Sequence, residues 1–140
     1  MQTFLCGNGF TGILRPQLLA MAQSDTESDT EIVIALTTVP TELDVDELVR
    51  KLLERRLVAC ANVLPPMRSA YWWKGTIETA EERQVVFKTR QGCVDALDAA
   101  LRELHPFDVP EFLVIPVFGG SEAYLRWVRV ETNERAEGQV

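Results

Sequence analysis

The spacing of apolar positions changes along the chain and predicts a strand followed by a helix. Residues 31 to 40 (EIVIALTTVP) form a short β-branched run that ends at a proline, which is typical of a buried strand. Between residues 41 and 57 the apolar side chains recur every three or four positions, with acidic residues first and arginines last. That charge order complements a helix dipole, and Thr41 with Asp44 predicts a capping box at the start of the helix.

A period of two then indicates a hairpin. Residues 58 to 64 predict a strand, and residues 70 to 78 (AYWWKGTIE) alternate as a second one. We expect the turn at residues 78 to 82 (ETAEE), because residues 83 to 89 again read as a strand. The segment from 68 to 78 would then span about 35 Å at ~3.3 Å per residue, about twice the length of a typical strand.

The second half of the chain repeats the order of helix and strand. Apolar residues at helical spacing predict a helix over residues 91 to 104, which Pro106 ends. Residues 111 to 118 (EFLVIPVF) are expected to form the last core strand. Ser121, after two glycines, predicts the cap of a final helix that carries Tyr124 and Trp127.

Two β-α-β halves on one antiparallel sheet predict an α+β fold, the ferredoxin-like βαββαβ sandwich, with an extended β-hairpin and a C-terminal helix. The helices cover one face of the sheet. We expect Tyr71, Trp73, Val85 and Phe87 to leave the other face apolar. Because an overhanging apolar hairpin and open sheet edges promote aggregation, we expect another copy of the chain to cover them in a closed ring.

Composition limits the class of protein. The chain has 140 residues and a net charge of −7, which fits one soluble domain and excludes a general nucleic-acid binder. Its apolar runs are shorter than the roughly 20 residues of a membrane span, so no membrane association is expected. Three widely spaced cysteines favour a reducing compartment.

The chain is expected to contain one domain, residues 31 to 132, between a disordered or variable leader (1 to 30) and a flexible C-terminal tail (133 to 140). The leader is polar and contains GNGFTG, which resembles a dinucleotide-binding motif but lacks the preceding strand. Met21 is a possible natural start, and a transit peptide is an alternative reading of the first 20 residues.

His105 is the only histidine, at a corner between a helix and a strand, and three roles are open to it. It could bind a metal together with Asp108, Glu111 or a carboxylate of a neighbouring subunit. It could act as an acid or base in catalysis, because histidine exchanges protons near neutral pH. It could also cap the preceding helix and hydrogen-bond a carbonyl.

Other reactive side chains have simpler interpretations. We expect Cys60 and Cys93 to pack as small apolar groups. Glu81 and Glu82 resemble a carboxylate pair, but we expect them in a solvated turn. Tyr71, Trp72, Trp73 and Trp127 either stack against a ligand or, as we favour, anchor subunit contacts. The sequence contains no obvious nucleophile beside a base, so enzyme activity is not expected unless catalytic groups assemble across subunits.

The segments LVACANVLP, SAYWWKGTIE, VVFKT, LHPFDVPEFLVIPV and AYLRWV, in this order, resemble the CutA family of divalent-cation tolerance proteins. The resemblance covers about residues 31 to 132. It implies a cytoplasmic homotrimer, similar in structure to the PII signalling proteins and joined through extended strands. It also implies a role in tolerance of copper and other divalent metal ions, without an established catalytic activity.

The resemblance further implies where ligands bind. In family members thought to hold copper through a cysteine and two adjacent histidines, the matching positions here are Thr37, Leu104 and His105. With only His105 retained, the expectation is weak binding of Cu(II) or another divalent cation, and no firm cofactor. The alternative function is a PII-like sensor that binds an anionic ligand in the clefts between subunits. The expected cleft residues are Tyr71, Trp73, Glu82, Lys88, His105 and Glu111.

Overall fold

The computed structural model describes residues 28 to 133. The expected tail beyond residue 133, the motif GNGFTG, Met21, Cys6 and all of the leader up to residue 27 lie outside the described residues. Residues 28 to 30 are helical and contact the domain, because Arg129 Nε donates a hydrogen bond to the Thr30 carbonyl oxygen over 3.2 Å.

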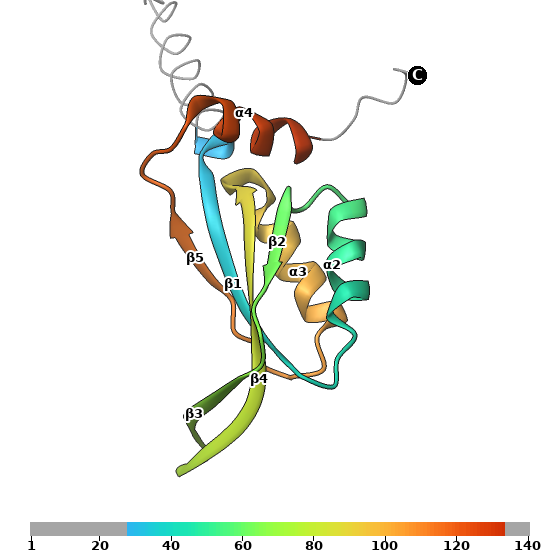
Figure 1. Cartoon of the computed structure of the whole chain (residues 1–140), viewed down its shortest axis with the longest axis vertical. Coiled ribbons are helices and arrows are strands. Elements are labelled where there is room, and N and C mark those ends of the chain that lie inside the picture. The colour runs from blue at the N-terminus through green and yellow to red at the C-terminus, as the bar shows by residue number, and fades with distance from the viewer. Residues whose placement is uncertain (1–27, 134–140) are drawn as a thin grey trace, which may run out of the picture.

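The element order is that of a ferredoxin-like sandwich followed by a helix, which confirms the predicted fold class (Figure 1). The strands are β1 Ile32–Pro40, β2 Cys60–Val63, β3 Met67–Trp73, β4 Thr76–Arg90 and β5 Leu113–Pro116, and the helices are α2 Val45–Glu54, the 3-10 turn Gln91–Cys93, α3 Val94–Leu104 and α4 Glu122–Glu131.

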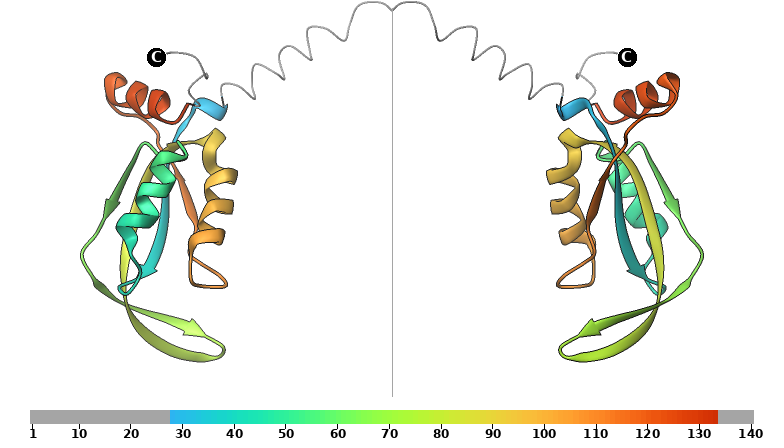
Figure 2. Two further views of the ribbon diagram at one scale, coloured as in Figure 1. Left: turned by 90° about the vertical axis from the view of Figure 1, so that its right-hand side faces the viewer. Right: turned by 90° about the vertical axis from the view of Figure 1, so that its left-hand side faces the viewer.

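The sheet has the strand order β2-β4-β1-β5, with β3 paired to the far half of β4, and every pairing is antiparallel. Helices α2 and α3 cover one face, and α4 lies across the end opposite the hairpin of β3 and β4 (Figures 1 and 2). The core between sheet and helices contains Val39, Leu52, Phe87, Leu97 and Leu101, each no more than 1% exposed. Burying such side chains supplies most of the stabilisation of a domain of this size.

The N-cap of helix α2 lies three residues after Thr41, the N-cap that the predicted capping box required. This N-cap is Asp44, whose side chain accepts a hydrogen bond from the Glu47 amide over 3.1 Å. Thr41 instead donates to the neighbouring Glu42 carboxylate. The prediction was wrong because aspartate is itself a strong N-cap residue and needs no partner at Thr41.

The hairpin turn also differs from the prediction. Lys74 and Gly75 form a two-residue turn with φ of 47° and 83°, and Trp73 pairs directly with Thr76. Positive φ at both central positions is what a type I′ hairpin turn requires, and glycine adopts it without steric cost. The segment ETAEE therefore lies inside the 15-residue strand β4, so the long strand of the molecule is β4 rather than residues 68 to 78.

The side chains of the returning strand face the helices, which corrects a second expectation. Val85 and Phe87 are both fully buried in the core instead of facing away from the helices. The register places Leu36 beside Val86, and Ile34 beside Ile115, on the face opposite α2 and α3.

The last strand is shorter and more exposed than predicted. β5 spans four residues at the edge of the sheet, paired only with β1 among the described strands. Leu113 and Ile115 are 53% and 46% exposed, and Phe118 beyond the strand is fully exposed. β5 is therefore an exposed apolar edge, although Phe112 before it and Val117 after it pack against the core clusters.

Candidate functional site

The base of the hairpin and the loop between α3 and β5 enclose a groove of about 740 Å³, which we call the hairpin groove. The hairpin and residues 106 to 111 supply most of its lining. Thr38 of β1 lies between them. The lining residues are Thr38, Met67, Ser69, Ala70, Tyr71, Trp73, Glu78, Glu82, Gln84, Pro106, Phe107, Asp108, Val109, Pro110 and Glu111.

The hairpin register explains which side chains share its wall. Tyr71 pairs with Glu78, and Met67 pairs with Glu82, so their side chains lie on the same face of the ribbon. Tyr71 and Trp73 are 38% and 44% exposed there. The opposite face of the ribbon carries Trp72, which is 71% exposed.

A hydrogen-bonded clamp holds the loop between α3 and β5 against the sheet. Gln84 Nε2 donates to the Thr37 carbonyl oxygen and to Glu111 Oε2, each over 2.8 Å. Thr37 Oγ1 donates to the Glu111 carbonyl oxygen over 2.7 Å. Because Thr37 is fully buried, these bonds satisfy polar groups that would otherwise destabilise the core. The clamp fixes Glu111 at the end of the groove.

Glu82 occupies a different environment from the solvated turn that the sequence predicted. It lies in β4 opposite Pro40 and Met67, and the residue is only 7% exposed. Glu81 is exposed on the other side of the same strand. Among the described residues none donates a hydrogen bond to the Glu82 carboxylate or forms an ion pair with it.

His105 lies behind the groove wall and adopts the capping role that the sequence left open. Its amide donates to the Leu101 carbonyl oxygen, which makes it the C-cap of α3. In the ring, Nδ1 accepts from the Phe107 amide over 3.0 Å, so Nε2 carries the proton and donates to the Thr38 carbonyl oxygen over 2.7 Å. Both ring nitrogens are engaged with the backbone, and the residue is 7% exposed.

The structure brings together four of the six predicted cleft residues. Tyr71, Trp73, Glu82 and Glu111 line the groove, whereas His105 contacts it only through its neighbours. Lys88 pairs with Cys60 and Ile34 in the middle of the sheet, about 20 Å along β4 from Glu82 at ~3.3 Å per residue. None of the described residues that line the groove carries a positive charge, although Lys74 Nζ at the hairpin turn lies 5.7 Å from the centroid of the Trp73 ring.

Sequence reasoning missed several lining residues. The turn at Lys74 and Gly75 was the signal that could have found them, because it sets the register that places Met67, Ser69 and Glu78 on the groove face. Gln84 gives no local signal, since its partners are 47 and 27 residues away in the chain.

The donor set does not fit a tight copper site within one chain. The described residues contain no group of three or more His, Cys, Asp or Glu side chains placed to hold a metal ion. Thr37 Oγ1 is committed to its hydrogen bond with Glu111, and Leu104 packs against the core. Of the three positions at which the resemblance implies copper ligands, only His105 carries a metal-binding side chain, and both of its ring nitrogens are engaged.

The two described cysteines differ in environment. Cys93 is buried, as predicted, with Sγ 3.7 Å from the Thr132 carbonyl oxygen. Cys60 is only partly buried, on the sheet face opposite α2 and α3. Partial burial, and secondly the charge of the Cys60 thiolate, raise the pKa of Tyr124 in α4.

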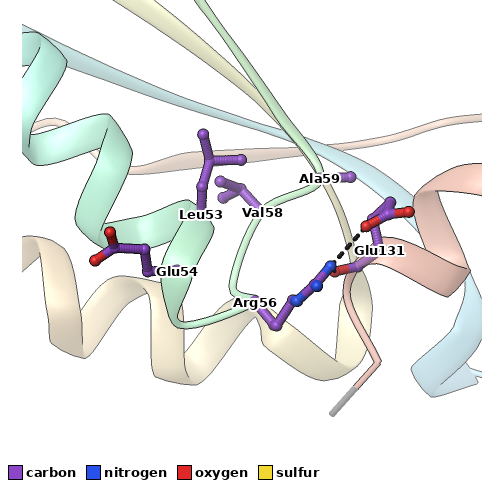
Figure 3. A pocket seen from close by; sticks show the side chains of 6 residues that line it. All are labelled: Leu53, Glu54, Arg56, Val58, Ala59 and Glu131. Atoms are coloured by element: carbon purple, nitrogen blue, oxygen red, sulfur yellow. Dashed lines mark hydrogen bonds and ion pairs between the residues drawn. The ribbon is translucent and has the colours of Figure 1, made fainter. Parts of the chain in front are cut away.

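A second hollow, of about 330 Å³, lies between the end of α2, the loop before β2 and the end of α4 (Figure 3). Arg56 reaches across it, and its Nη1 contacts Glu131 Oε2 over 2.6 Å. Its floor includes Val58 and Ala59. Arg56 and Glu131 neutralise each other's charge. We therefore interpret this ion pair as a contact that attaches α4 to the rest of the domain.

No helix in the described part of the chain is long and apolar enough to cross a membrane.

Comparison with known proteins gives one consistent result. The family model described as "CutA1 divalent ion tolerance protein" matches residues 33 to 131. The divalent-cation tolerance protein CutA of Pectobacterium atrosepticum is 41% identical over 70% of this chain and 89% of its own length. The protein of the same description from Pyrococcus horikoshii is 40% identical over 74% of this chain and 100% of its own.

A solved structure gives the same answer for the fold. The crystal structure of CutA1 from Oryza sativa superposes with a TM-score of 0.72 and 33% identity, and the match covers 76% of this chain and 98% of that one. The order of elements, the long β4 hairpin and the match over most of the domain point to the same relationship. The chain therefore belongs to the CutA1 family of divalent ion tolerance proteins.

Proposed function

We propose that this protein is a homotrimeric, non-catalytic divalent-ion tolerance protein of the cytoplasm that binds Cu(II) or another divalent cation weakly near His105. Membership of the family is the observation that carries the proposal. The acidic net charge of −7 supports it, because a negative surface attracts cations.

Weak binding has a physical reason in the geometry of His105. A metal at Nδ1 must displace the Phe107 amide, and a metal at Nε2 must displace the proton donated to Thr38. Either exchange costs a hydrogen bond of a buried group, on the order of 1–3 kcal/mol. Only the free energy of coordination above that cost contributes to affinity.

The apolar edge supports assembly into a trimer. Leu113, Ile115 and Phe118 lie together with exposed side chains along β5 and its continuation, and Trp127 of α4 is 41% exposed. An apolar edge strand of this kind is protected in native proteins by pairing or covering it. A cyclic trimer would cover three copies of it at once.

Calorimetry with Cu(II) tests the binding site, using wild type, His105→Ala and Cys60→Ala. We expect weak binding by wild type, a loss in His105→Ala, and no change in Cys60→Ala, which controls for copper held by the partly exposed thiol. Equal binding by wild type and His105→Ala would remove His105 from the site. Native mass spectrometry of the same samples tests the trimer, and a monomer at micromolar concentration would contradict it.

A further inference from the structure

The hairpin groove has a chemical character that divalent-cation tolerance does not explain. Its lining combines aromatic rings with carboxylates, and none of the described residues that line it is a lysine, an arginine or a histidine. The rings are those of Tyr71, Trp73 and Phe107, and the carboxylates are those of Glu78, Glu82, Asp108 and Glu111. The groove is therefore negative and partly apolar.

Glu82 is the member of this set that points to a ligand. Glu111 accepts a hydrogen bond from Gln84, but Glu82 has no donor among the described residues although it is only 7% exposed. Its oxygens are not among the fully buried side-chain atoms without a partner, so they keep contact with the groove. A cation with N–H donors that entered the groove would meet this carboxylate without a competing donor from the described residues.

The surroundings favour an organic cation over a metal ion. Calcium takes six to eight oxygen ligands, and magnesium requires an octahedral set. The described residues provide no cluster of three acidic, histidine or cysteine side chains for either ion. An ammonium group needs less: one carboxylate for its charge, and aromatic faces that attract it through cation–π interactions.

The size of the groove agrees with this choice. A volume of about 740 Å³ lies within the range of sites for small organic molecules, about 300–1,000 Å³. Met67 and Ala70 add apolar surface beside the rings of Tyr71 and Trp73. An alkyl chain attached to the ammonium group would pack against this surface and lose unfavourable contact with water.

We propose that the hairpin groove binds a small aliphatic amine in its ammonium form, with the nitrogen at Glu82 and the alkyl chain against the aromatic rings. The site goes beyond the proposed metal tolerance and does not depend on His105. A neighbouring copy of the chain is the competing source of a cation for Glu82, so the experiment has to separate the two.

Calorimetry at pH 7 with putrescine tests the proposal, and 1,4-butanediol, which has the same length but no charge, is the control ligand. We expect wild type to bind putrescine and not the diol. Glu82→Gln should weaken binding of putrescine about tenfold or more, because the charge partner is lost. Glu81→Gln is the matched control, since Glu81 is exposed on the opposite side of β4, and it should bind as wild type does.

Two measurements keep the result interpretable. If the Glu82 carboxylate has no partner in the unliganded protein, Glu82→Gln should leave the thermal midpoint unchanged or raise it. A lower midpoint in Glu82→Gln would place a partner subunit's cation at Glu82 and overturn the proposal. Absence of putrescine binding by wild type, or equal binding by Glu82→Gln, would also overturn it.

The mass of each variant, measured by native mass spectrometry, separates this proposal from the proposed trimer. If wild type is a trimer that does not bind putrescine, only the proposed amine site is overturned. If wild type is a monomer that binds putrescine, only the proposed trimer is overturned.

Discussion

The Nε2 nitrogen of His105 donates a hydrogen bond to the Thr38 carbonyl oxygen over 2.7 Å, which links the end of α3 to β1. The two residues are 67 positions apart in the chain. The Phe107 amide donates a second hydrogen bond, to Nδ1 of the same ring. His105 therefore has a structural role between α3 and the loop that follows it.

His105→Ala should therefore destabilise the protein even when no metal is present. The change leaves the Thr38 carbonyl and the Phe107 amide without their partners, and it opens space near the core. We expect a loss of about 2 kcal/mol in the free energy of unfolding, since each unsatisfied buried group costs about 1–3 kcal/mol. Urea unfolding in the presence of a chelator measures it, and stability equal to wild type would contradict the described hydrogen bonds.

The hairpin turn provides a second prediction, at Gly75. Its φ of 83° is unfavourable for any residue with a Cβ, although a Cβ there would meet no atom within 4 Å. Gly75→Ala should therefore cost about 1 kcal/mol through the backbone alone. Gly119→Ala is the control, because Gly119 also has open space around it but no positive φ, and its effect should stay within about 0.5 kcal/mol. Urea unfolding at one fixed protein concentration compares the variants, and equal costs would argue against the turn.

The end of α2 is a Schellman motif with an arginine where glycine is usual. Arg56 has φ of 59°, its amide bonds to the Leu53 carbonyl oxygen, and the Leu57 amide bonds to that of Leu52. The backbone conformation is unfavourable for arginine, but its side chain gains the contact with Glu131 across the hollow in Figure 3.

Two substitutions at Arg56 separate these effects. Arg56→Ala and Arg56→Gly both remove the ion pair, but only glycine relieves the left-handed backbone. We expect Arg56→Gly to be more stable than Arg56→Ala by about 1 kcal/mol. Thermal unfolding measures the difference. If the alanine variant were the more stable one, the positive φ at this position would be wrong.

The pH dependence of stability has a local source in α2. Arg50 donates to both carboxylate oxygens of Glu47, and this hydrogen bonding lowers the pKa of Glu47 below its usual value of 4.5. A depressed folded-state pKa means that the contribution is present above pH 4.5 and is lost as the pH falls below it. We expect Glu47→Gln to lessen the fall in stability between neutral and acid pH, and urea unfolding at several pH values measures this. An unchanged pH profile would contradict the contribution of Glu47.

Several parts of the fold followed from local patterns. The period of apolar residues predicted α2 and α3 because a helix buries every third or fourth side chain, whatever lies opposite. The strand β1 was predicted from its β-branched run before Pro40, although buried and half-buried side chains alternate along most of it. The hairpin was misread because the period of two continues through Lys74 and Gly75, so a two-residue turn hardly disturbs the alternation.

The sequence by itself determined the order of strands and helices, the core-facing positions of the helices and the chemical groups available to a site. Only the tertiary structure decided where those groups lie, because burial and hydrogen bonding depend on contacts between residues distant in the chain. The Gln84–Glu111 clamp, the low exposure of Glu82 and the engaged ring of His105 each arise from strand register and from the return of the loop after α3. No local pattern encodes these contacts.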